Sequence, residues 1–80
     1  MTYGTKSAIK AAYLSGLEKT YPWAAPDSPH RAAGMSAAEK AVDGALAGRI
    51  KLEGDIWFQV LADNGVQKSA SRQMISDLPD

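Results

Sequence analysis

Apolar side chains recur at helical spacing in the first quarter of the chain. In residues 5–21 four of them are one helical turn apart and would share one face of a helix: Ile9, Tyr13, Leu17 and Tyr21. The hydroxyl of Thr5 or Ser7 can accept a hydrogen bond from the backbone N–H groups of the first turn. The pattern therefore predicts an amphipathic helix over residues 5–21.

A second helical pattern covers residues 35–49. Ser36 and Glu39 have the spacing of a capping box, in which each side chain accepts a hydrogen bond from a backbone N–H group at the start of a helix. The residues that follow the helical period are Met35, Ala38, Val42, Ala45, Leu46 and Arg49. Small residues between them allow another helix to approach closely. We expect this helix to pack against the first one or, alternatively, against a second copy in a homodimer.

An extended connector and a third helix are predicted next. Residues 50–54 alternate apolar and polar side chains, which favours an extended segment that buries Ile50 and Leu52. Asp55 then caps a helix over residues 55–64, which ends at an Asn-Gly stop signal. The side chains expected to face inward are Ile56, Trp57, Val60 and Leu61.

A last helix is predicted over residues 69–78. Ser69 or Ser71 can cap its first turn, and Pro79 ends it because proline cannot continue the hydrogen-bond pattern. The side chains expected to face inward are Ala70, Met74, Ile75 and Leu78.

These elements predict an all-α protein with a single helical domain over residues 1–80. The expected architecture is a small bundle of three to four helices with a proline-rich loop after the first helix. Its predicted core consists of Ile9, Tyr13, Leu17, Val42, Leu46, Trp57, Val60, Leu61, Met74 and Ile75.

The loop between the first two helices is predicted to be stiff. It contains three prolines, and each fixes its own φ angle and biases the preceding residue towards an extended conformation. The tryptophan of this loop has two interpretations: its ring covers the core, or it is an exposed anchor for a partner. Under the second interpretation the candidate partner-binding residues are Tyr21, Trp23, His30 and Arg31.

Charge and composition make several functions and locations unfavourable. Nine basic and nine acidic residues cancel, whereas a protein that neutralises many phosphates usually has a basic excess, so nucleic-acid binding is disfavoured. No apolar run approaches the roughly 18 residues that a membrane span needs. Residues 1–12 are too polar for a signal peptide, and the lack of cysteine fits a reducing compartment. We therefore expect a cytoplasmic protein.

No catalytic, cofactor-binding or metal site is expected. With no cysteine and a single histidine, His30, the chain cannot assemble a four-ligand zinc site. His30 lies near Asp27 and Ser28, but neighbours in a proline-rich loop do not supply the geometry of a catalytic triad. The glycines are scattered rather than gathered in a phosphate-binding loop. These observations predict a protein that is not an enzyme.

The last two predicted helices are also spaced like a helix-turn-helix, a DNA-binding motif. In that alternative the residues at the DNA are Lys68, Ser69, Ser71, Arg72 and Gln73. Leu61 stands four residues before Gly65, where the motif has a small residue, and residues 63–80 carry two cations against three carboxylates. These departures favour a helical hairpin that closes the core, with DNA binding by residues 55–78 as the alternative.

Four parts of the sequence resemble small accessory proteins of temperate phages and prophages. They are Tyr21-Pro22-Trp23-Ala24 after the first helix, the long alanine-rich helix, Gly54-Asp55-Ile56-Trp57, and the ending Ile75-Ser76-Asp77-Leu78-Pro79. The resemblance carries over no catalytic residues. It implies a role, because such proteins often act by binding one host or phage protein and blocking it.

The sequence thus leads to three functional predictions. The first is a non-enzymatic protein-binding module, a phage-encoded inhibitor or antirepressor that blocks a host or phage protein in the host cell cytoplasm, alone or as a homodimer. The second is a small DNA-binding regulator that uses residues 55–78. The third is a structural or assembly subunit of a virion. None of the three requires a cofactor.

Overall fold

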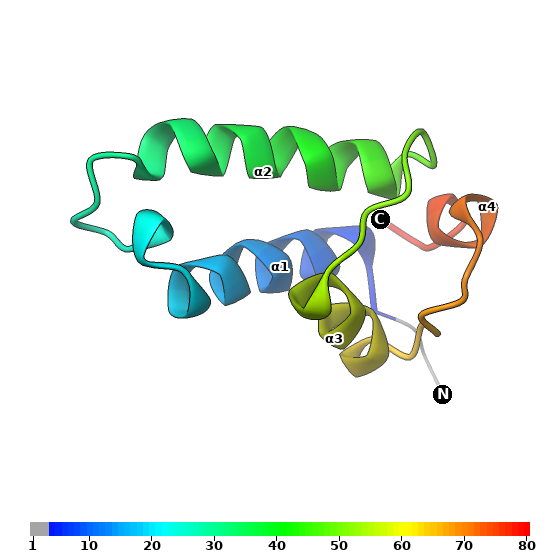
Figure 1. The fold of residues 1–80 in the computed structure, drawn as a ribbon. Helices are drawn as coiled ribbons and strands as arrows, with labels where there is room; N and C mark the ends of the chain where they lie inside the picture. Colours follow the sequence, from blue (N-terminus) through cyan, green and yellow to red (C-terminus); the bar gives the residue numbers. More distant parts are fainter. Residues whose placement is uncertain (1–3) are drawn as a thin grey trace.

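The computed structural model describes residues 4–80, which form four α-helices and one short 3-10 helix (Figure 1). The α-helices are α1 (Lys6–Thr20), α2 (Arg31–Leu46), α3 (Asp55–Asp63) and α4 (Arg72–Ser76), and the 3-10 helix η1 (Pro22–Ala24) follows α1. The described residues contain no β-strand, so the predicted all-α bundle with a proline-rich loop after its first helix is confirmed. Residues 1–3 of the expected domain lie outside this description.

The helices pack in pairs around α1 and α2, which run side by side (Figure 1). α3 packs against α1, and the absence of a side chain at Gly16 lets the two helices approach closely. A Cβ atom at Gly16 would lie only 2.9 Å from Cγ2 of Ile56. α4 packs against the end of α2 and, among the described residues, its backbone does not come close to that of α3. None of these helices combines the length and the apolar character of a membrane-spanning helix.

The core lies where α1, α2 and α3 meet. Eight of the residues predicted for it are buried, namely Ile9, Leu17, Val42, Leu46, Trp57, Val60, Leu61 and Ile75. Tyr13 is half-buried and packs edge-on against Trp57, with the ring centroids 5.7 Å apart. The prediction for Met74 is wrong, because its side chain is exposed. Burial of the apolar set supplies the main stabilisation of a domain this small.

α2 begins one turn earlier than its sequence pattern predicts. Its first residue is Arg31, so Ser36 lies inside the helix and the predicted capping box is wrong. Ser28 prepares the start instead: its carbonyl accepts a hydrogen bond from the Arg31 N–H at 3.3 Å, and its hydroxyl accepts one from the His30 N–H at 3.2 Å. The alanines that follow are strong helix formers, so the helix extends back to the last proline of the loop.

The end of α2 also comes earlier than predicted, and Arg49 lies outside the helix. The N–H of Arg49 donates to the carbonyl of Gly44 at 2.9 Å, and that of Gly48 donates to Ala45 at 3.1 Å, which is a Schellman turn. Gly48 has a φ of 75°, a left-handed conformation that favours glycine. A Cβ atom there would lie 3.2 Å from the Arg72 carbonyl oxygen, so this glycine also lets α4 approach.

The predicted cap of α3 is wrong, whereas its predicted stop signal is confirmed. Gly54 is the N-cap and Asp55 is the first helical residue, so the predicted cap is wrong. The Asp55 carboxylate stabilises the helix through its attraction to the positive end of the helix dipole, without a capping hydrogen bond. At the other end Gly65 has a φ of 79°. The N–H of Val66 donates to the carbonyl of Leu61 at 2.8 Å, which confirms the Asn-Gly stop signal as a second Schellman turn.

The connector after α2 buries only one of its two predicted residues. Leu52 packs against the core, whereas 43% of Ile50 is exposed. Ile50 lies on α2 at Gly44, because a Cβ atom on that glycine would be 3.3 Å from Cγ1 of Ile50. One side of Ile50 therefore covers the helix and its other side faces solvent.

α4 is shorter than predicted. Of the two candidate caps the structure uses Ser71, whose hydroxyl accepts a hydrogen bond from the Met74 N–H at 3.1 Å. The helix ends at Ser76, three residues before Pro79. Proline disfavours the helical conformation of its preceding residue, which explains why the helix does not reach Leu78.

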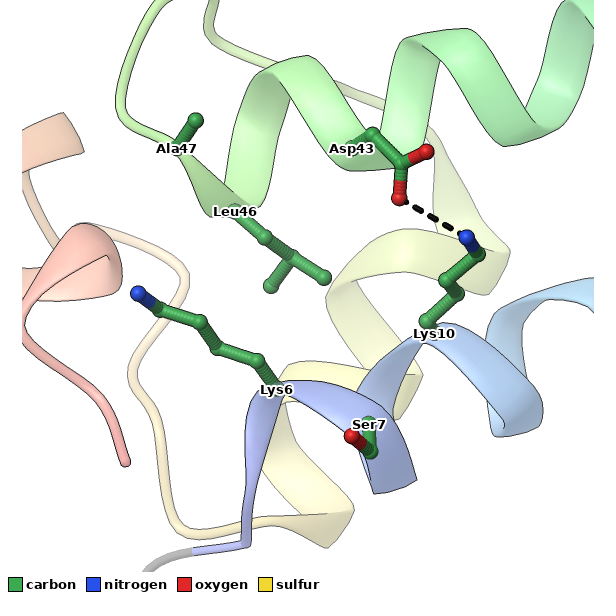
Figure 2. A pocket seen from close by; sticks show the side chains of 6 residues that line it. All are labelled: Lys6, Ser7, Lys10, Asp43, Leu46 and Ala47. Atoms are coloured by element: carbon green, nitrogen blue, oxygen red, sulfur yellow. Dashed lines mark ion pairs between the residues drawn. The ribbon is translucent and has the colours of Figure 1, made fainter. Parts of the chain in front are cut away.

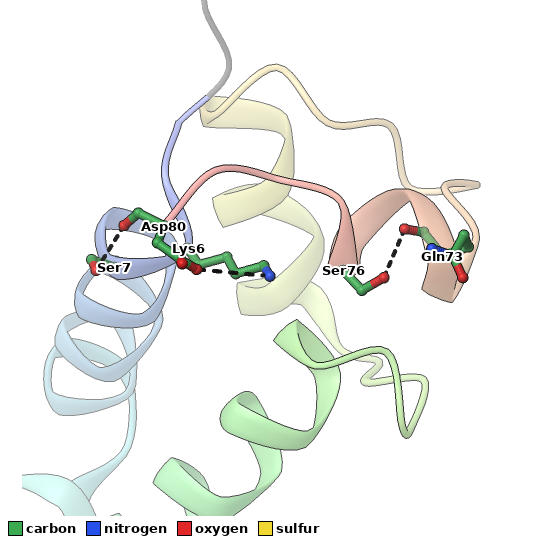
Figure 3. Close-up of polar contacts among 5 residues, drawn as sticks. All are labelled: Lys6, Ser7, Gln73, Ser76 and Asp80. Carbon is green, nitrogen blue, oxygen red and sulfur yellow. Dashed lines mark hydrogen bonds and ion pairs between the residues drawn. The ribbon is translucent and has the colours of Figure 1, made fainter.

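Residues before and at the start of α1 are hydrogen-bonded to the C-terminal part of the chain (Figure 3). Lys6 donates its backbone N–H to the carbonyl of Pro79 at 2.7 Å, and Ser7 donates its hydroxyl to the carbonyl of Asp80 at 3.0 Å. The Thr5 hydroxyl accepts from the Ala8 N–H at 3.1 Å, so Thr5 is the cap. The bonds of the Lys6 and Ala8 N–H groups satisfy donors that have no partner within the helix.

Candidate interaction site

Tyr21 and Trp23 form a stacked pair in the loop between α1 and α2, which we call the aromatic patch. Their ring centroids are 6.1 Å apart and their planes differ by 16°. Tyr21 is 43% exposed and Trp23 is half-buried. The indole lies on α2 at Gly34, because a Cβ atom on that glycine would be 2.3 Å from Cζ3 of Trp23. Trp23 is therefore neither a fully buried core residue nor a fully exposed one.

The backbone holds the aromatic patch in place through consecutive hydrogen bonds. The N–H of Tyr21 donates to Leu17 at 2.9 Å, that of Ala24 to Tyr21 at 3.1 Å, and that of Ala25 to Pro22 at 3.2 Å. The side chain of Ala24 is completely buried, and η1 packs against both α1 and α2. These hydrogen bonds and the buried Ala24 attach the turn to the two long helices.

The two polar candidates beside the patch have different surroundings. The Arg31 guanidinium pairs with the carboxylate of Glu18 on α1, and its Nε donates to the carbonyl of Ala24 at 3.2 Å. Arg31 thus ties the loop to both long helices. His30 is exposed at the N-cap position of α2, where its side chain makes no capping hydrogen bond. The structure brings Tyr21 and Trp23 together and gives Arg31 a structural contact that sequence reasoning missed.

The side chains of the DNA-binding alternative make contacts within the protein. Lys68 places its Nζ 4.7 Å from the centre of the Phe58 ring. Ser71 caps α4, and Nη1 of Arg72 donates to the carbonyl of Arg49 at 3.2 Å. Nε2 of Gln73 donates to Asp77 at 2.9 Å.

Ser69, the remaining residue of this alternative, has its hydroxyl oxygen 3.5 Å from Oε1 of Gln67. In a helix-turn-helix the second helix presents several side chains to the major groove while the first helix supports it. α4 has five residues and packs on α2 rather than on α3. The packing of α3 and α4 is therefore not that of a helix-turn-helix.

An apolar groove of about 570 Å³ lies beside α4, and we call it the C-terminal groove. It is lined by Gly65, Val66, Gln67, Ser69, Ala70, Met74, Asp77, Leu78 and Pro79. Sequence reasoning missed this groove because it assigned Met74 to the core. The signal that could have found it is the shortness of the last helical pattern, which leaves too few turns to bury both Met74 and Ile75.

A smaller hollow of about 290 Å³ lies between the first turns of α1 and the last turn of α2 (Figure 2). Its polar side chains pair within the protein. Nζ of Lys10 is 2.9 Å from Oδ1 of Asp43, and Nζ of Lys6 is 3.8 Å from Oδ1 of Asp80. The hydrogen bond to Asp43 raises the pKa of Lys10. These contacts link α1 to α2 and to the C-terminal segment.

Comparisons with known proteins add no family to this description. No protein-family model, no curated protein and no solved structure matches the chain. Within residues 4–80, no three side chains of His, Asp or Glu gather as a metal site would require.

The environment of Tyr13 predicts a loss of stability at alkaline pH. Burial raises the pKa of Tyr13 above its ordinary value of 10.0, and the nearby Tyr21 raises it further. Above that ordinary value the unfolded chain releases a proton that the folded chain retains, so the free energy of unfolding falls as the pH rises. Lys10, whose pKa is also raised, acts in the same direction above its own ordinary value of 10.5.

We expect the Tyr13→Phe variant to lose less stability than the parent as the pH rises through the region above 10.0. The measurement is the urea midpoint of both proteins at a series of alkaline pH values. The phenyl ring keeps the edge-on contact with Trp57, so the variants should differ mainly in this slope. Parallel curves would show that the Tyr13 hydroxyl has the same pKa in the folded and unfolded chains.

Proposed function

We propose that this protein is a non-enzymatic protein-binding module that contacts its partner through the aromatic patch. The observation that carries the proposal is the stacked Tyr21–Trp23 pair, partly exposed on a turn that several backbone hydrogen bonds hold in place. Tyrosine and tryptophan carry much of the binding energy at protein interfaces. A turn that is already ordered loses little conformational entropy when it binds.

The proposed partner is a host or phage protein. This choice follows the resemblance to phage accessory proteins, and the proposed action is to bind and block that protein in the cytoplasm as an inhibitor or antirepressor. A second copy of the chain is the other protein that the patch could contact. His30, exposed near the patch, is available for a polar contact at its edge.

The proposal predicts that Tyr21→Ala strongly weakens capture of the partner. Truncation of an interface tyrosine commonly costs about 2 kcal/mol or more, a loss of about 30-fold in affinity. Ile50→Ala is the matched control, because Ile50 is an equally exposed large apolar residue that is not part of the patch. The measurement is affinity capture from host lysate with quantitative mass spectrometry, followed by the dissociation constants of the purified partner with all three proteins.

A second variant tests whether binding depends on the position of the Trp23 ring, without removing the ring. Gly34→Ala introduces a Cβ atom where the Trp23 ring lies, so the ring must move while both aromatic residues remain. We expect this variant to bind more weakly and to retain its helical content. Equal affinity of the parent, Tyr21→Ala and Gly34→Ala for the captured protein would exclude the aromatic patch as the binding surface. Association that weakens steeply with salt would instead indicate a nucleic-acid partner.

A further inference from the structure

The C-terminal groove is formed before any partner binds, because hydrogen bonds from Gly4 and Lys6 hold both of its sides in place. The N–H of Gly4 donates to the carbonyl of Asn64 at 3.2 Å, next to the turn that begins one wall. The N–H of Lys6 donates to Pro79, which lines the other wall. Val66 lines the groove and also belongs to the buried core, so the groove borders directly on the interior.

Met74 gives the groove an exposed apolar surface. Its side chain is 62% exposed, whereas its neighbour Ile75 is 7% exposed and belongs to the core. Together with Ala70 and Leu78, Met74 presents apolar atoms that another molecule can cover. A methionine side chain is flexible and polarisable, and it adapts to apolar groups of different shapes.

Asp77 gives the groove its charge. It is the one charged residue among those that line the groove. Nε2 of Gln73 donates to its Oδ1 at 2.9 Å and so orients the carboxylate. In the part of the chain that the structure describes, no lysine, arginine or histidine forms an ion pair with Asp77. An occupant with a positive charge beside its apolar group complements this surface.

We propose that the C-terminal groove binds a segment of a partner protein that presents a large aliphatic or aromatic side chain next to a lysine or arginine. The apolar side chain covers Met74, Ala70 and Leu78, and the cation lies beside Asp77. Met74 of α4 lines the groove, and α4 lies at the end of the molecule opposite the loop between α1 and α2 (Figure 1). The groove is thus a second binding surface, independent of the aromatic patch, and the two together allow this protein to hold two partners at once.

The test is a titration followed by the NMR signals of the methyl groups of Val66, Ala70, Met74 and Leu78. The probe is an N-acetylated, C-amidated pentapeptide with a central phenylalanine flanked by two lysines. One matched peptide replaces the lysines with glutamates, and another replaces the phenylalanine with alanine. We expect saturable shifts of these methyl signals with a dissociation constant of about 1 mM for the first peptide and weaker binding of the other two.

Two variants test the groups that are proposed to make the contact. Asp77→Asn keeps an oxygen for Gln73 but removes the charge, so it should weaken binding of the lysine peptide about two- to five-fold at low salt and leave the glutamate peptide no weaker. Met74→Gln keeps the length of the side chain and should weaken binding at least about five-fold. Ile50→Gln, an exposed apolar residue outside the groove, should bind like the parent.

Other results overturn the proposal. Equal binding of the lysine and glutamate peptides, shifts that map away from the groove, or no saturable shift at about 10 mM peptide would each do so. Groove signals that move with protein concentration alone would show that a second copy occupies the groove. Tyr21→Ala should bind the peptides like the parent, so failure of this proposal and failure of the aromatic patch are distinguishable.

Discussion

Leu61→Ala is expected to remove a large part of the free energy of unfolding of the protein. Leu61 is 1% exposed at the centre of the core, and removing a buried leucine side chain costs about 2–5 kcal/mol through lost burial and the cavity that remains. A domain of this size is typically stable by roughly 4–12 kcal/mol in total. The measurement is urea denaturation followed by far-UV circular dichroism. The midpoint should fall sharply or disappear.

Ile50→Ala provides the control for this experiment. It removes as many carbon atoms as Leu61→Ala does. Ile50, however, is partly exposed: one side of its side chain lies against α2 and the other faces solvent. We expect it to cost less than about 1 kcal/mol. If both variants melt at the same urea concentration, the core has been assigned to the wrong face of α3.

Ile75→Ala is expected to release the C-terminal segment from the rest of the fold. Ile75 is the one buried residue of α4, and α4 packs against α2 alone among the helices. Loss of about 2–5 kcal/mol at this contact should open residues 71–78 before the three longer helices unfold. Amide hydrogen exchange in this segment should become about 30-fold faster or more, with smaller changes in α1 and α3.

Met74→Ala is the matched control, because Met74 is the residue before Ile75 in the same helix and its side chain is exposed. Exchange in the segment should remain close to that of the parent. Uniformly faster exchange through the whole chain in Ile75→Ala would instead show that α4 unfolds only together with the core.

Much of the fold could be predicted because its main elements have local causes. The spacing of Ile9 and Leu17 places α1, and the Asn-Gly signal ends α3 one residue before the expected position. The start of α2 could not be found from periodicity, because alanine forms helix well on either side of the Ser36 pattern. The start depends on Ser28, whose turn precedes the helix and leaves no periodic signal.

The burial of individual residues depended on contacts distant in sequence. Ile50 and Met74 are apolar residue types common in protein cores, yet Ile50 follows the end of α2 and Met74 lies on the exposed side of the short helix α4. The aromatic patch was anticipated because its prolines and aromatic residues are adjacent in the chain. The contacts that hold the patch in place could not be predicted from the sequence. The Arg31–Glu18 pair joins residues on different helices, and the contact of Trp23 with Gly34 forms only when the loop folds onto α2. The C-terminal groove is lined by residues close in sequence, but the bonds that hold its sides come from Gly4 and Lys6, which are distant from them.

The hydrogen bond from the Lys6 N–H to Pro79 has a consequence for synthesis on the ribosome. Lys6, in the first turn of α1, is synthesised well before Pro79, its hydrogen-bond partner. Until Pro79 leaves the exit tunnel, α1 and α2 can pair through local contacts, while the two walls of the C-terminal groove remain unconnected. We therefore expect the nascent chain to acquire its long helices first and its groove only after residue 80 has emerged.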